Sequence, residues 1–377
     1  MKKIKVLQFT IAASQGGRTQ YILNNWKNID KNRFQFDFIT FSSNLDFADE
    51  LEAQGCLVYY ISCYPEEDKI QFIKELDKIL ENGYDVIHVH TSYWRSFIVE
   101  ERAKANGIKK IIIHSHGTGI NKAISQKEAL ELEEEHYRVR ECINETLADE
   151  FLACSKSAAE WLYGNRISKS RIKIVHNAIN TNKYKYNQAI REAHREQLGW
   201  KNKFVIGQVA RFVYQKNHEF TIDVFKDVCK LIPNAILVLV GDGALKGKIE
   251  EKVRRYELTN RVYFTGLRKD VNVLLQSMDV LVLPSLYEAL GIALIEAQTS
   301  GLPCIASEGY TTIEAKITEL LEYEELIVDK WTDRIYKIYE KMCNNTFARE
   351  DKSENTRAAG YDIVDAIKLL EKIYEGI

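Results

Sequence analysis

Residues 279–307 read DVLVLPSLYEALGIALIEAQTSGLPCIAS, and this stretch decides the fold. The short apolar run 280–283, ended by a proline, predicts a strand buried on both faces of a parallel sheet. A loop follows over 285–291. A helix is predicted over 292–300, and it ends there because a glycine and a proline follow. Residues 304–306 then predict the next strand, so the stretch is a strand–loop–helix–strand unit whose loop lies where open parallel sheets bind ligands.

Two glutamates punctuate this unit. Glu288 lies on the loop, and Glu296 follows eight residues later, about one turn into the predicted helix. Between them, Leu290, Gly291 and Ile292 can turn backbone N–H groups outward at a helix N-terminus, which favours a phosphate. The glycine also allows a ligand to come close to the backbone. An anion seat between two carboxylates suits a nucleotide-sugar; the alternative is an ordinary strand–helix corner with two solvated glutamates.

Length and composition bound the remaining possibilities. The chain has 377 residues, of which 45% are hydrophobic, enough for two α/β domains with proper cores. The formal net charge of −2 gives no general attraction to nucleic acid. Seven scattered cysteines without a C-x-x-C indicate reduced thiols rather than disulfides or a zinc site. No apolar window reaches the ~18 residues of a membrane span. The N-terminus predicts a first strand rather than a signal peptide, so we expect a cytoplasmic protein.

The central stretch resembles a known signature. Glu288-Ala-Leu-Gly291, ending in Glu296-Ala297, is similar to the E-x7-E motif of retaining GT-B glycosyltransferases, in particular glycosyltransferase family 4. Ala289 stands where that family commonly has glycine, but both carboxylates and Gly291 are present. The resemblance implies that Glu288 holds the donor sugar and that Glu296 holds the ribose.

A second motif follows the first strand of the C-terminal half. Ala210-Arg211-Phe-Val-Tyr-Gln-Lys216-Asn217 resembles the G-R-x4-K-N motif of the same family, with alanine in place of its glycine. A guanidinium fork and a mobile ammonium suit two phosphates of a leaving diphosphate. Two solvated surface cations are the alternative, but the position directly after a strand favours a site at Arg211 and Lys216.

Two glycine-containing turns complete the expected donor site. Gly16-Gly17 follows the first strand and precedes a helix, and the family has a Gly-Gly at this point, where the backbone approaches the donor diphosphate. Later in the chain, Leu267 and Arg268 follow a strand-ending glycine. The resemblance makes them candidates for contact with the nucleotide base.

Histidines end two strands of the N-terminal half. His88 and His90 lie two residues apart on one strand, and His114 and His116 on the next, so each pair shares a face and a metal site is conceivable. No carboxylate or cysteine partner is evident nearby, and we expect no metal. His116-Gly117 matches a His-Gly that the family places beside the donor sugar. His88 and His114 are expected in the core, and the role of His90 stays open.

The order of strands and helices predicts an α/β chain with a GT-B fold, two Rossmann-like, doubly wound parallel-sheet domains facing a cleft. We expect an acceptor-side domain over 1–182 and a nucleotide-sugar-binding domain over 183–355. Residues 356–377 resemble the C-terminal helix of capsular and exopolysaccharide members of family 4, which crosses back onto the first domain. The polar segment 183–203 is predicted to be the linker.

The resemblance implies a retaining glycosyltransferase that moves a sugar from a nucleotide-sugar, by prior a UDP-sugar, to a glycan acceptor. We expect a lipid-linked acceptor, peripheral contact with the inner membrane face, and a role in bacterial capsular, exopolysaccharide or other surface polysaccharide synthesis. The catalytic set is then Arg211, Lys216, Glu288 and His116. Because no Asp-x-Asp occurs in the sequence, no obligatory metal or other cofactor is expected.

Other functions fit parts of the pattern. A GT-B nucleotide-sugar 2-epimerase would share the cleft but needs an acid/base pair and no acceptor. A non-catalytic two-domain sugar-binding protein of periplasmic type would have paired Rossmann-like domains, but it has no use for Arg211 together with Lys216. A nicotinamide dehydrogenase is disfavoured because no G-x-G-x-x-G follows the first strand.

Overall fold

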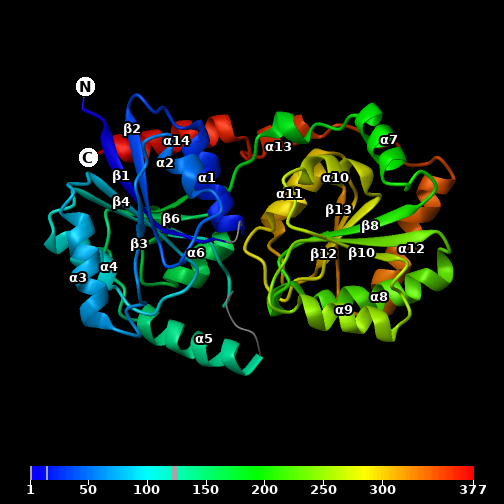
Figure 1. Cartoon of the computed structure of the whole chain (residues 1–377), viewed down its shortest axis with the longest axis horizontal. Helices are drawn as coiled ribbons and strands as arrows, with labels where there is room; N and C mark the ends of the chain where they lie inside the picture. Colours follow the sequence, from blue (N-terminus) through cyan, green and yellow to red (C-terminus); the bar gives the residue numbers. More distant parts are fainter. Residues whose placement is uncertain (1, 14–15, 121–125) are drawn as a thin grey trace. The chain divides into compact units, whose positions relative to one another are not determined.

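The structure is a computed structural model that describes residues 2–13, 16–120 and 126–377. The chain divides into two compact units, each built on one parallel sheet (Figure 1). The first unit takes in 1–120, 130–178 and 363–377, and the second takes in 121–129 and 179–362. Two α/β Rossmann-like units are the predicted fold class, which is confirmed.

The first unit holds a seven-stranded sheet in the order β3-β2-β1-β4-β5-β6-β7, and all neighbouring strands run parallel. The strand order reverses on either side of β1, as doubly wound sheets require. The strands are β1 (Ile4–Ile11), β2 (Phe34–Thr40), β3 (Val58–Tyr60), β4 (Val86–Thr91), β5 (Lys110–Ser115), β6 (Glu150–Ala153) and β7 (Ile172–Ile174).

Helices cover this sheet, and the C-terminal helix is one of them. The helices are α1 (Gly17–Asn28), α2 (Ala48–Glu52), α3 (Lys69–Leu80), α4 (Ile98–Ala105), α5 (Gln126–Arg140), α6 (Lys156–Tyr163), η1 (Lys169–Arg171) and α14 (Ile363–Glu375). α1, α2 and α14 share one apolar core with the strands, in which Trp26, Phe36 and Tyr374 are almost fully buried. In Figure 1 α14, in red, lies beside α1 and α2, so the last residues of the chain complete the first unit.

The second unit holds a six-stranded parallel sheet in the order β10-β9-β8-β11-β12-β13. Its strands are β8 (Phe204–Val209), β9 (Ala235–Val240), β10 (Val262–Gly266), β11 (Val280–Leu283), β12 (Cys304–Ser307) and β13 (Leu321–Glu324). Its helices are η2 (Thr181–Tyr184), α7 (Gln188–Gln197), η3 (Tyr214–Lys216), α8 (His218–Leu231), α9 (Lys246–Arg255), α10 (Val271–Ser277), α11 (Ile292–Thr299), η4 (Ile313–Ala315), α12 (Val328–Cys343) and α13 (Ser353–Ala358). α8, α9 and α12 pack in one apolar core with the strands, and α10 and α11 pack in another.

The prediction that 183–203 is a linker is wrong. Most of this segment forms α7, which packs against α10. The Arg195 guanidinium is buried, donates to the Ser277 carbonyl at 2.7 Å and pairs with Asp279 at 3.0 Å. Trp200 is 4% exposed and belongs to the core. A run of charged residues usually indicates a solvated segment. Here the charged side chains bind buried carbonyls and a buried carboxylate.

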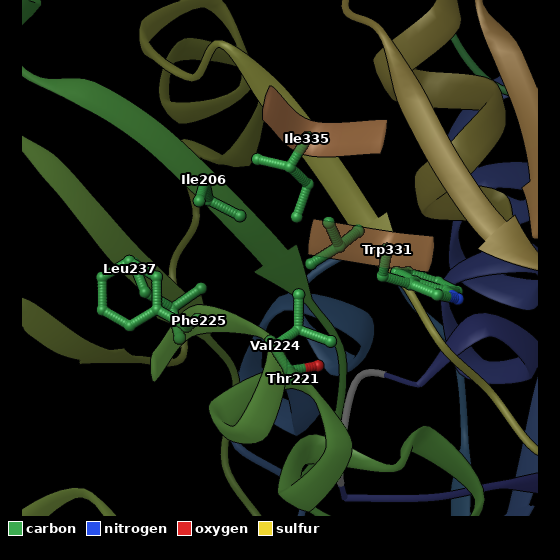
Figure 2. Close-up of a pocket in the computed structure, with 8 residues that line it drawn as sticks. Ile206, Thr221, Val224, Phe225, Leu237, Trp331 and Ile335 are labelled. Carbon is green, nitrogen blue, oxygen red and sulfur yellow. The ribbon is translucent and has the colours of Figure 1, made fainter. Parts of the chain in front are cut away.

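A small cavity lies inside the second unit, between the sheet and helices α8 and α12 (Figure 2). It measures about 10 Å³ and is lined by Ile206, Thr221, Val224, Phe225, Leu237, Val282, Trp331 and Ile335. That volume is about one water molecule in size, and the lining is almost entirely apolar. The cavity is therefore a packing defect of the core rather than a ligand site.

Candidate active site

β8 and β11 are neighbours in the second sheet, so the loops that follow them leave the same sheet edge. Two hydrogen bonds join these loops. The Leu286 N–H donates to the Gln215 carbonyl at 2.8 Å, and the Gln215 side-chain amide donates to the Tyr287 carbonyl at 2.7 Å. Sequence reasoning missed Gln215, because a glutamine inside a motif gives no signal that its amide bridges to a loop 72 residues away.

Three of the predicted catalytic residues come together on these loops. The Lys216 ammonium forms an ion pair with Glu288, and the Ser285 hydroxyl donates to the same carboxylate oxygen at 3.2 Å. Arg211 is partly buried, and its guanidinium makes no hydrogen bond or ion pair with another described residue. Burial lowers the pKa of its guanidinium, and the nearby Glu288 charge opposes that shift. Two cations therefore share one carboxylate, which leaves a net positive charge able to take up an anion.

Lys216 is held by the strand and helix around it. The Gln208 side chain on β8 donates to the Lys216 carbonyl at 2.8 Å, and the Thr221 hydroxyl on α8 donates to Gln208 at 2.8 Å. Asn217 follows with φ 49°, a left-handed conformation that asparagine tolerates, and α8 begins one residue later. The backbone of the lysine is thus fixed while its side chain carries the charge.

Two glycines after β9 fix the loop that carries Arg211. The Phe212 N–H donates to the Asp242 carbonyl at 3.0 Å. Gly241 has φ 140°, and a Cβ there would lie 2.1 Å from the Ala210 carbonyl oxygen. Gly243 has φ 154°, and its Cβ would lie 2.6 Å from the Phe212 carbonyl oxygen. These glycines therefore let the loops after β8 and β9 touch.

Gly291 marks the start of α11, as predicted, and adopts φ 72° at the N-cap position. A Cβ at this glycine would meet the Glu288 Cγ at 3.1 Å and Leu283 Cδ2 at 3.2 Å. The Leu290 side chain is buried in the core, and Ile292 is partly buried. The first N–H groups of the helix lie next to the Glu288 loop, where the helix dipole favours negative charge.

Glu296 lies in the middle of α11 and accepts a hydrogen bond from the Tyr184 hydroxyl at 2.5 Å. Burial raises the pKa of its carboxyl to about 7, although the tyrosine hydrogen bond and the nearby Lys183 charge oppose the shift. At neutral pH this carboxyl is therefore poised between its protonated and ionised forms. Tyr184 was missed because it lies 112 residues before Glu296, in the segment taken for a linker.

The two candidates for contact with the base lie after β10. Gly266 adopts φ 67°, and the Leu267 side chain that follows is 62% exposed. The Arg268 guanidinium forms two hydrogen bonds with Asp270, at 2.8 and 2.7 Å. No hydrogen bond or ion pair among the described residues joins Leu267 or Arg268 to the Glu288 loop, so their role stays a prediction.

In the first unit, Gly16 and Gly17 lie at the start of α1. Gly16 is the N-cap and Gly17 is the first helical residue. A Cβ at Gly17 would find no atom within 4 Å, so packing within the protein does not demand a glycine there. Arg18, which sequence reasoning did not single out, donates to the His90 carbonyl at 3.3 Å. The helix start therefore places a cation close to the histidine strands.

His116 follows β5 directly. Its backbone N–H donates to the Thr91 carbonyl at 2.9 Å, and its ring Nε2 lies 2.9 Å from Nδ1 of His90. A Cβ at Gly117 would lie 2.7 Å from the Cβ of Ser92, so this glycine is needed for close packing. The His-Gly pair is thus held against the end of β4.

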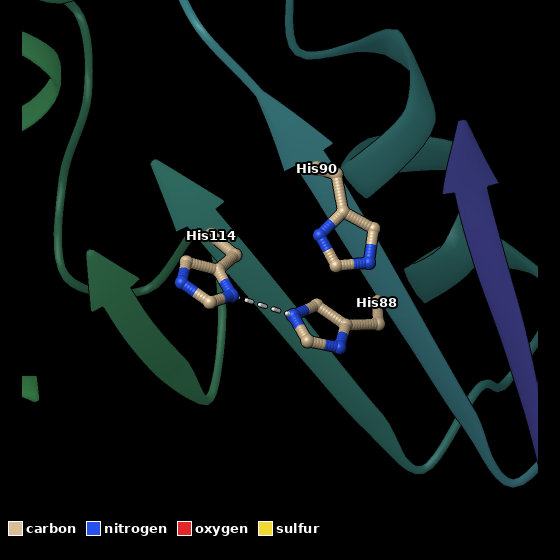
Figure 3. A group of neighbouring side chains, drawn as sticks. All are labelled: His88, His90 and His114. Atoms are coloured by element: carbon tan, nitrogen blue, oxygen red, sulfur yellow. Dashed lines mark hydrogen bonds between the residues drawn. The ribbon is translucent and has the colours of Figure 1, made fainter. Parts of the chain in front are cut away.

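His88 and His114 are buried, as predicted, and lie beside His90 (Figure 3). The His116 ring lies next to both His90 and His114, with centroids 5.1 and 4.1 Å away. One ring nitrogen from each of His88, His90 and His114 lies within 4.8 Å of the others, a spacing that a metal ion could use. The ring nitrogens of His88 and His90 already take part in hydrogen bonds with neighbouring side chains. The absence of a metal from this protein stays a prediction.

Comparison with known proteins identifies the family. Residues 190–357 match the group 1 glycosyl transferases, and residues 15–183 match Glycosyltransferase Family 4. These ranges fall on the two halves of the chain. The range 190–357 contains Arg211, Lys216 and Glu288. The chain is a glycosyltransferase of the GT-B fold.

This glycosyltransferase has relatives in polysaccharide synthesis. It is 29% identical to EpsF of Bacillus subtilis, whose name describes it as a glycosyltransferase, over 98% of this chain and 96% of EpsF. It is 24% identical to the UDP-Gal:alpha-D-GlcNAc-diphosphoundecaprenol alpha-1,3-galactosyltransferase of Escherichia coli, over 81% of this chain and 80% of that enzyme. A shorter match, 29% identical over 41% of each chain, is to the amylovoran biosynthesis glycosyltransferase AmsD of Erwinia amylovora.

Solved structures agree with the fold of the glycosyltransferase. Anabaena HepE, crystallised with UDP and glucose, superposes with a TM-score of 0.77 at 18% identity, covering 99% of this chain and 100% of HepE. WaaG, a glycosyltransferase involved in lipopolysaccharide biosynthesis, superposes with a TM-score of 0.72 at 17% identity, covering 99% of this chain and 100% of WaaG. Among the described residues, every helix is too short or too polar to cross a bilayer.

Proposed function

We propose that this glycosyltransferase is a retaining enzyme that transfers a sugar from a UDP-sugar to a lipid-linked glycan acceptor in bacterial surface polysaccharide synthesis. The observation that carries the proposal is the group formed by Arg211, Lys216 and Glu288 beside the start of α11. Two cations, one carboxylate and a helix N-terminus at one sheet edge match a diphosphate bonded to a sugar. Glu296 lies on the same helix, where a ribose would complete the donor.

The cations act on the leaving group. Breaking the bond between the anomeric carbon and the diphosphate oxygen leaves negative charge on the phosphates, which Arg211, Lys216 and the α11 N-terminus are placed to stabilise. Preorganised donors of this kind typically contribute about 3–4 kcal/mol each. In the structure Lys216 is paired with Glu288. Donor binding then exchanges partners, so that the ammonium moves to phosphate and Glu288 accepts hydrogen bonds from sugar hydroxyls.

Retention of the anomeric configuration follows from the face on which the acceptor attacks. The acceptor oxygen attacks the anomeric carbon on the face that the diphosphate leaves, and the acceptor proton passes to the departing phosphate oxygen. A double displacement would need a carboxylate free to attack that carbon. In the proposed donor complex Glu288 accepts hydrogen bonds from the sugar hydroxyls and from Ser285, which does not suit a nucleophile. His116 would position the donor sugar or the acceptor.

Relatives support the choice of donor and acceptor. The solved HepE structure contains UDP, and the E. coli relative uses a UDP-sugar and a diphosphoundecaprenol-linked acceptor, as its name states. A lipid-linked acceptor places the reaction at the inner membrane face. We therefore propose a cytoplasmic enzyme that contacts this surface peripherally.

Nucleotide binding tests the donor site. The protein is titrated with UDP, GDP and ADP by calorimetry in EDTA, as wild type, Glu296→Ala, Lys216→Ala and Lys248→Ala. We expect micromolar UDP binding, weakened at least about tenfold in the first two variants. Lys248 is an exposed lysine paired with Glu219, so Lys248→Ala should bind like wild type. Absence of UDP binding, or equal binding by all variants, would contradict the assignment, and binding that needs added metal would contradict the metal-free mechanism.

The raised pKa of Glu296 predicts a pH dependence. An ionised carboxylate accepts the ribose hydroxyls, so affinity should fall as the pH drops through about 7 and the carboxyl becomes protonated. Between pH 8 and pH 6 we expect about a tenfold loss of UDP-glucose affinity. UDP-glucose is the right probe because its diphosphate diester keeps its charge over this range. Glu296→Gln should bind more weakly at pH 8 with a flat profile; an equally steep profile in that variant would assign the titration to another group.

A further inference from the structure

Four histidines of the first unit form a buried cluster, the histidine cluster, that Gln8 and Tyr374 complete. Its members come from β4, from β5 and from the residue after β5: His88, His90, His114 and His116. Gln8 lies on β1 and is 2% exposed, and Tyr374 on α14 is fully buried. The six side chains are joined by five hydrogen bonds. The proposed function uses only His116, so the rest of the cluster needs its own explanation.

The hydrogen bonds on one side of Gln8 have a fixed direction. The Gln8 Oε1 lies 2.7 Å from Nε2 of His90, and an amide oxygen can only accept, so His90 carries its proton on Nε2. The ring is neutral, because burial and the neighbouring histidines hold its pKa well below the usual value. Its Nδ1 is therefore an acceptor, and His116 must donate to it from Nε2 across 2.9 Å.

The other side of Gln8 obeys the same logic. The Gln8 amide N–H donates to the Tyr374 oxygen at 3.3 Å, and the phenol proton then has Nδ1 of His88, 2.8 Å away, as its acceptor. His88 then carries its proton on Nε2 and donates it to Nδ1 of His114 at 3.2 Å, the bond drawn in Figure 3. All four histidines therefore share one tautomer, with the proton on Nε2.

In the alternative state every hydrogen bond of the cluster runs in the opposite direction. If the Gln8 amide turned over, its N–H would face His90 and its oxygen would face Tyr374. Every donor would then become an acceptor, and all four rings would carry the proton on Nδ1. Between His116 and Gln8, a mixed arrangement leaves two donors or two acceptors facing each other, which is costly where water cannot compensate. At Tyr374, a phenol oxygen that accepted from both Gln8 and His88 would leave its own proton without an acceptor in the cluster. The cluster thus has two states in which all of its hydrogen bonds are satisfied, and the Gln8 amide selects between them.

We propose that Gln8 and Tyr374 are positioning residues that hold the histidine cluster in one shared tautomer, and so fix which ring nitrogen of His116 carries the proton. In the arrangement described, Nε2 of His116 is the donor and its Nδ1 is an acceptor. The Asn177 side chain interacts with this ring and raises the pKa of His116, and among the described residues neither Nδ1 of His116 nor Oδ1 of Asn177 has another hydrogen-bond partner. The meaning for catalysis rests on the proposed function, in which His116 positions the donor sugar or the acceptor.

A bound metal explains the cluster less well. Binding through His88 and His90 would break their bonds to Tyr374, His114, Gln8 or His116. From the surrounding elements Arg18 and Tyr21 face the cluster, and the arginine charge lowers the pKa of His90 and His116 and disfavours a cation there. Neutral histidines joined by hydrogen bonds suit this environment.

Nitrogen-15 NMR of the histidine rings tests the proposal. Full-length protein labelled with ¹⁵N-histidine is recorded at pH 7 in EDTA, and each cluster ring is assigned by its own His→Gln variant. We expect all four rings to show the same single tautomer, with the proton on Nε2. Gln8→Met keeps the side-chain length but removes the amide, and should give mixed tautomers at His90 and His116. Tyr374→Phe, which keeps the ring, should give mixed tautomers at His88 and His114.

Leu370→Ala is the matched control. Leu370 is buried on the same helix as Tyr374 but has no polar group, so the variant should lose stability while all four rings keep one tautomer. Different tautomers within the wild-type cluster would overturn the proposal. So would an unchanged His116 in Gln8→Met, or ring shifts that change when Zn²⁺ replaces EDTA. If Gln8→Met does not fold, the Tyr374→Phe result alone decides.

Activity separates this inference from the proposed function. With a working donor and acceptor, Gln8→Met should lower kcat by up to about 10²-fold, because a misplaced group near the reacting atoms costs rate. The tautomers are read without any substrate. If wild type shows the shared tautomer but transfers no sugar, the proposed function fails while the assignment of Gln8 stands. If kcat falls in Gln8→Met without any tautomer change, Gln8 is only structural.

Discussion

Lys216→Ala is expected to lower kcat by about 10²–10³-fold, because it removes one of two cations placed to stabilise the leaving diphosphate. Initial rates with a saturating UDP-sugar and acceptor measure the effect. Stability should change less than activity, since the Lys216 backbone remains held through its bond from Gln208. Thermal unfolding of the same samples checks that the variant is folded.

A second variant separates two explanations for such a loss. Removing Lys216 also leaves Glu288, which is 9% exposed, without its cation, and that unpaired charge could itself repel the diphosphate. UDP lacks the transferred sugar that Glu288 is proposed to hold, so its binding does not need Glu288. Lys216→Ala combined with Glu288→Gln removes both charges, and we expect UDP binding to stay weak if the ammonium contacts phosphate. Recovery of wild-type UDP affinity in the double variant would show that Lys216 serves only to neutralise Glu288.

Glu288→Gln alone completes the cycle. It frees Lys216 and leaves the net charge of the group more positive, so UDP should bind at least as tightly as to wild type. The sugar-dependent part of binding should be lost instead, which a comparison of UDP with UDP-glucose measures. Non-additive effects of the two substitutions would report the ion pair directly.

The sequence predicted those parts of the site that are coded locally. Glu288, Gly291 and Glu296 lie within nine residues of one another. The left-handed backbone at the start of the helix needs only a glycine at position 291, which the sequence shows directly. Arg211 and Lys216 likewise lie on one loop, directly after a strand that the apolar pattern indicates. Their meeting with Glu288 follows from the topology, because β8 and β11 are neighbours in the sheet.

Partners far away in the sequence could not be predicted. Tyr184 reaches Glu296 from a segment whose charges were read as exposed, although its Arg195 binds buried groups. Gln8 and Tyr374 meet although they lie 366 residues apart. A single glutamine on a strand and a tyrosine on a helix carry no spacing pattern that would pair them. The histidine spacing was visible, but its hydrogen-bonded order depends on the register between β4 and β5.

Gly241→Ala is expected to destabilise the second unit by about 3 kcal/mol or more and to abolish most activity. At φ 140° a side chain is strained, which typically costs about 1–3 kcal/mol. The new Cβ would also lie 2.1 Å from the Ala210 carbonyl oxygen, and relieving such overpacking costs about 1–3 kcal/mol more. The backbone that must move is the one leading into Arg211, so the guanidinium shifts away from the diphosphate. Denaturant unfolding and kcat measure the two effects.

Gly247→Ala is the matched control, because it makes the same substitution on α9, where the added Cβ meets no atom within 4 Å. Alanine favours helix and restricts the unfolded chain, so stability should rise by about 0.4–1 kcal/mol with activity unchanged. The expected changes in stability have opposite signs although both variants make the same glycine-to-alanine substitution, so the difference reports the local structure. If Gly241→Ala were as stable as Gly247→Ala, the two loops would not be in contact. If it lost stability but kept full kcat at a temperature where it is folded, the position of Arg211 would not depend on Gly241, and the turn after β9 would serve the fold alone.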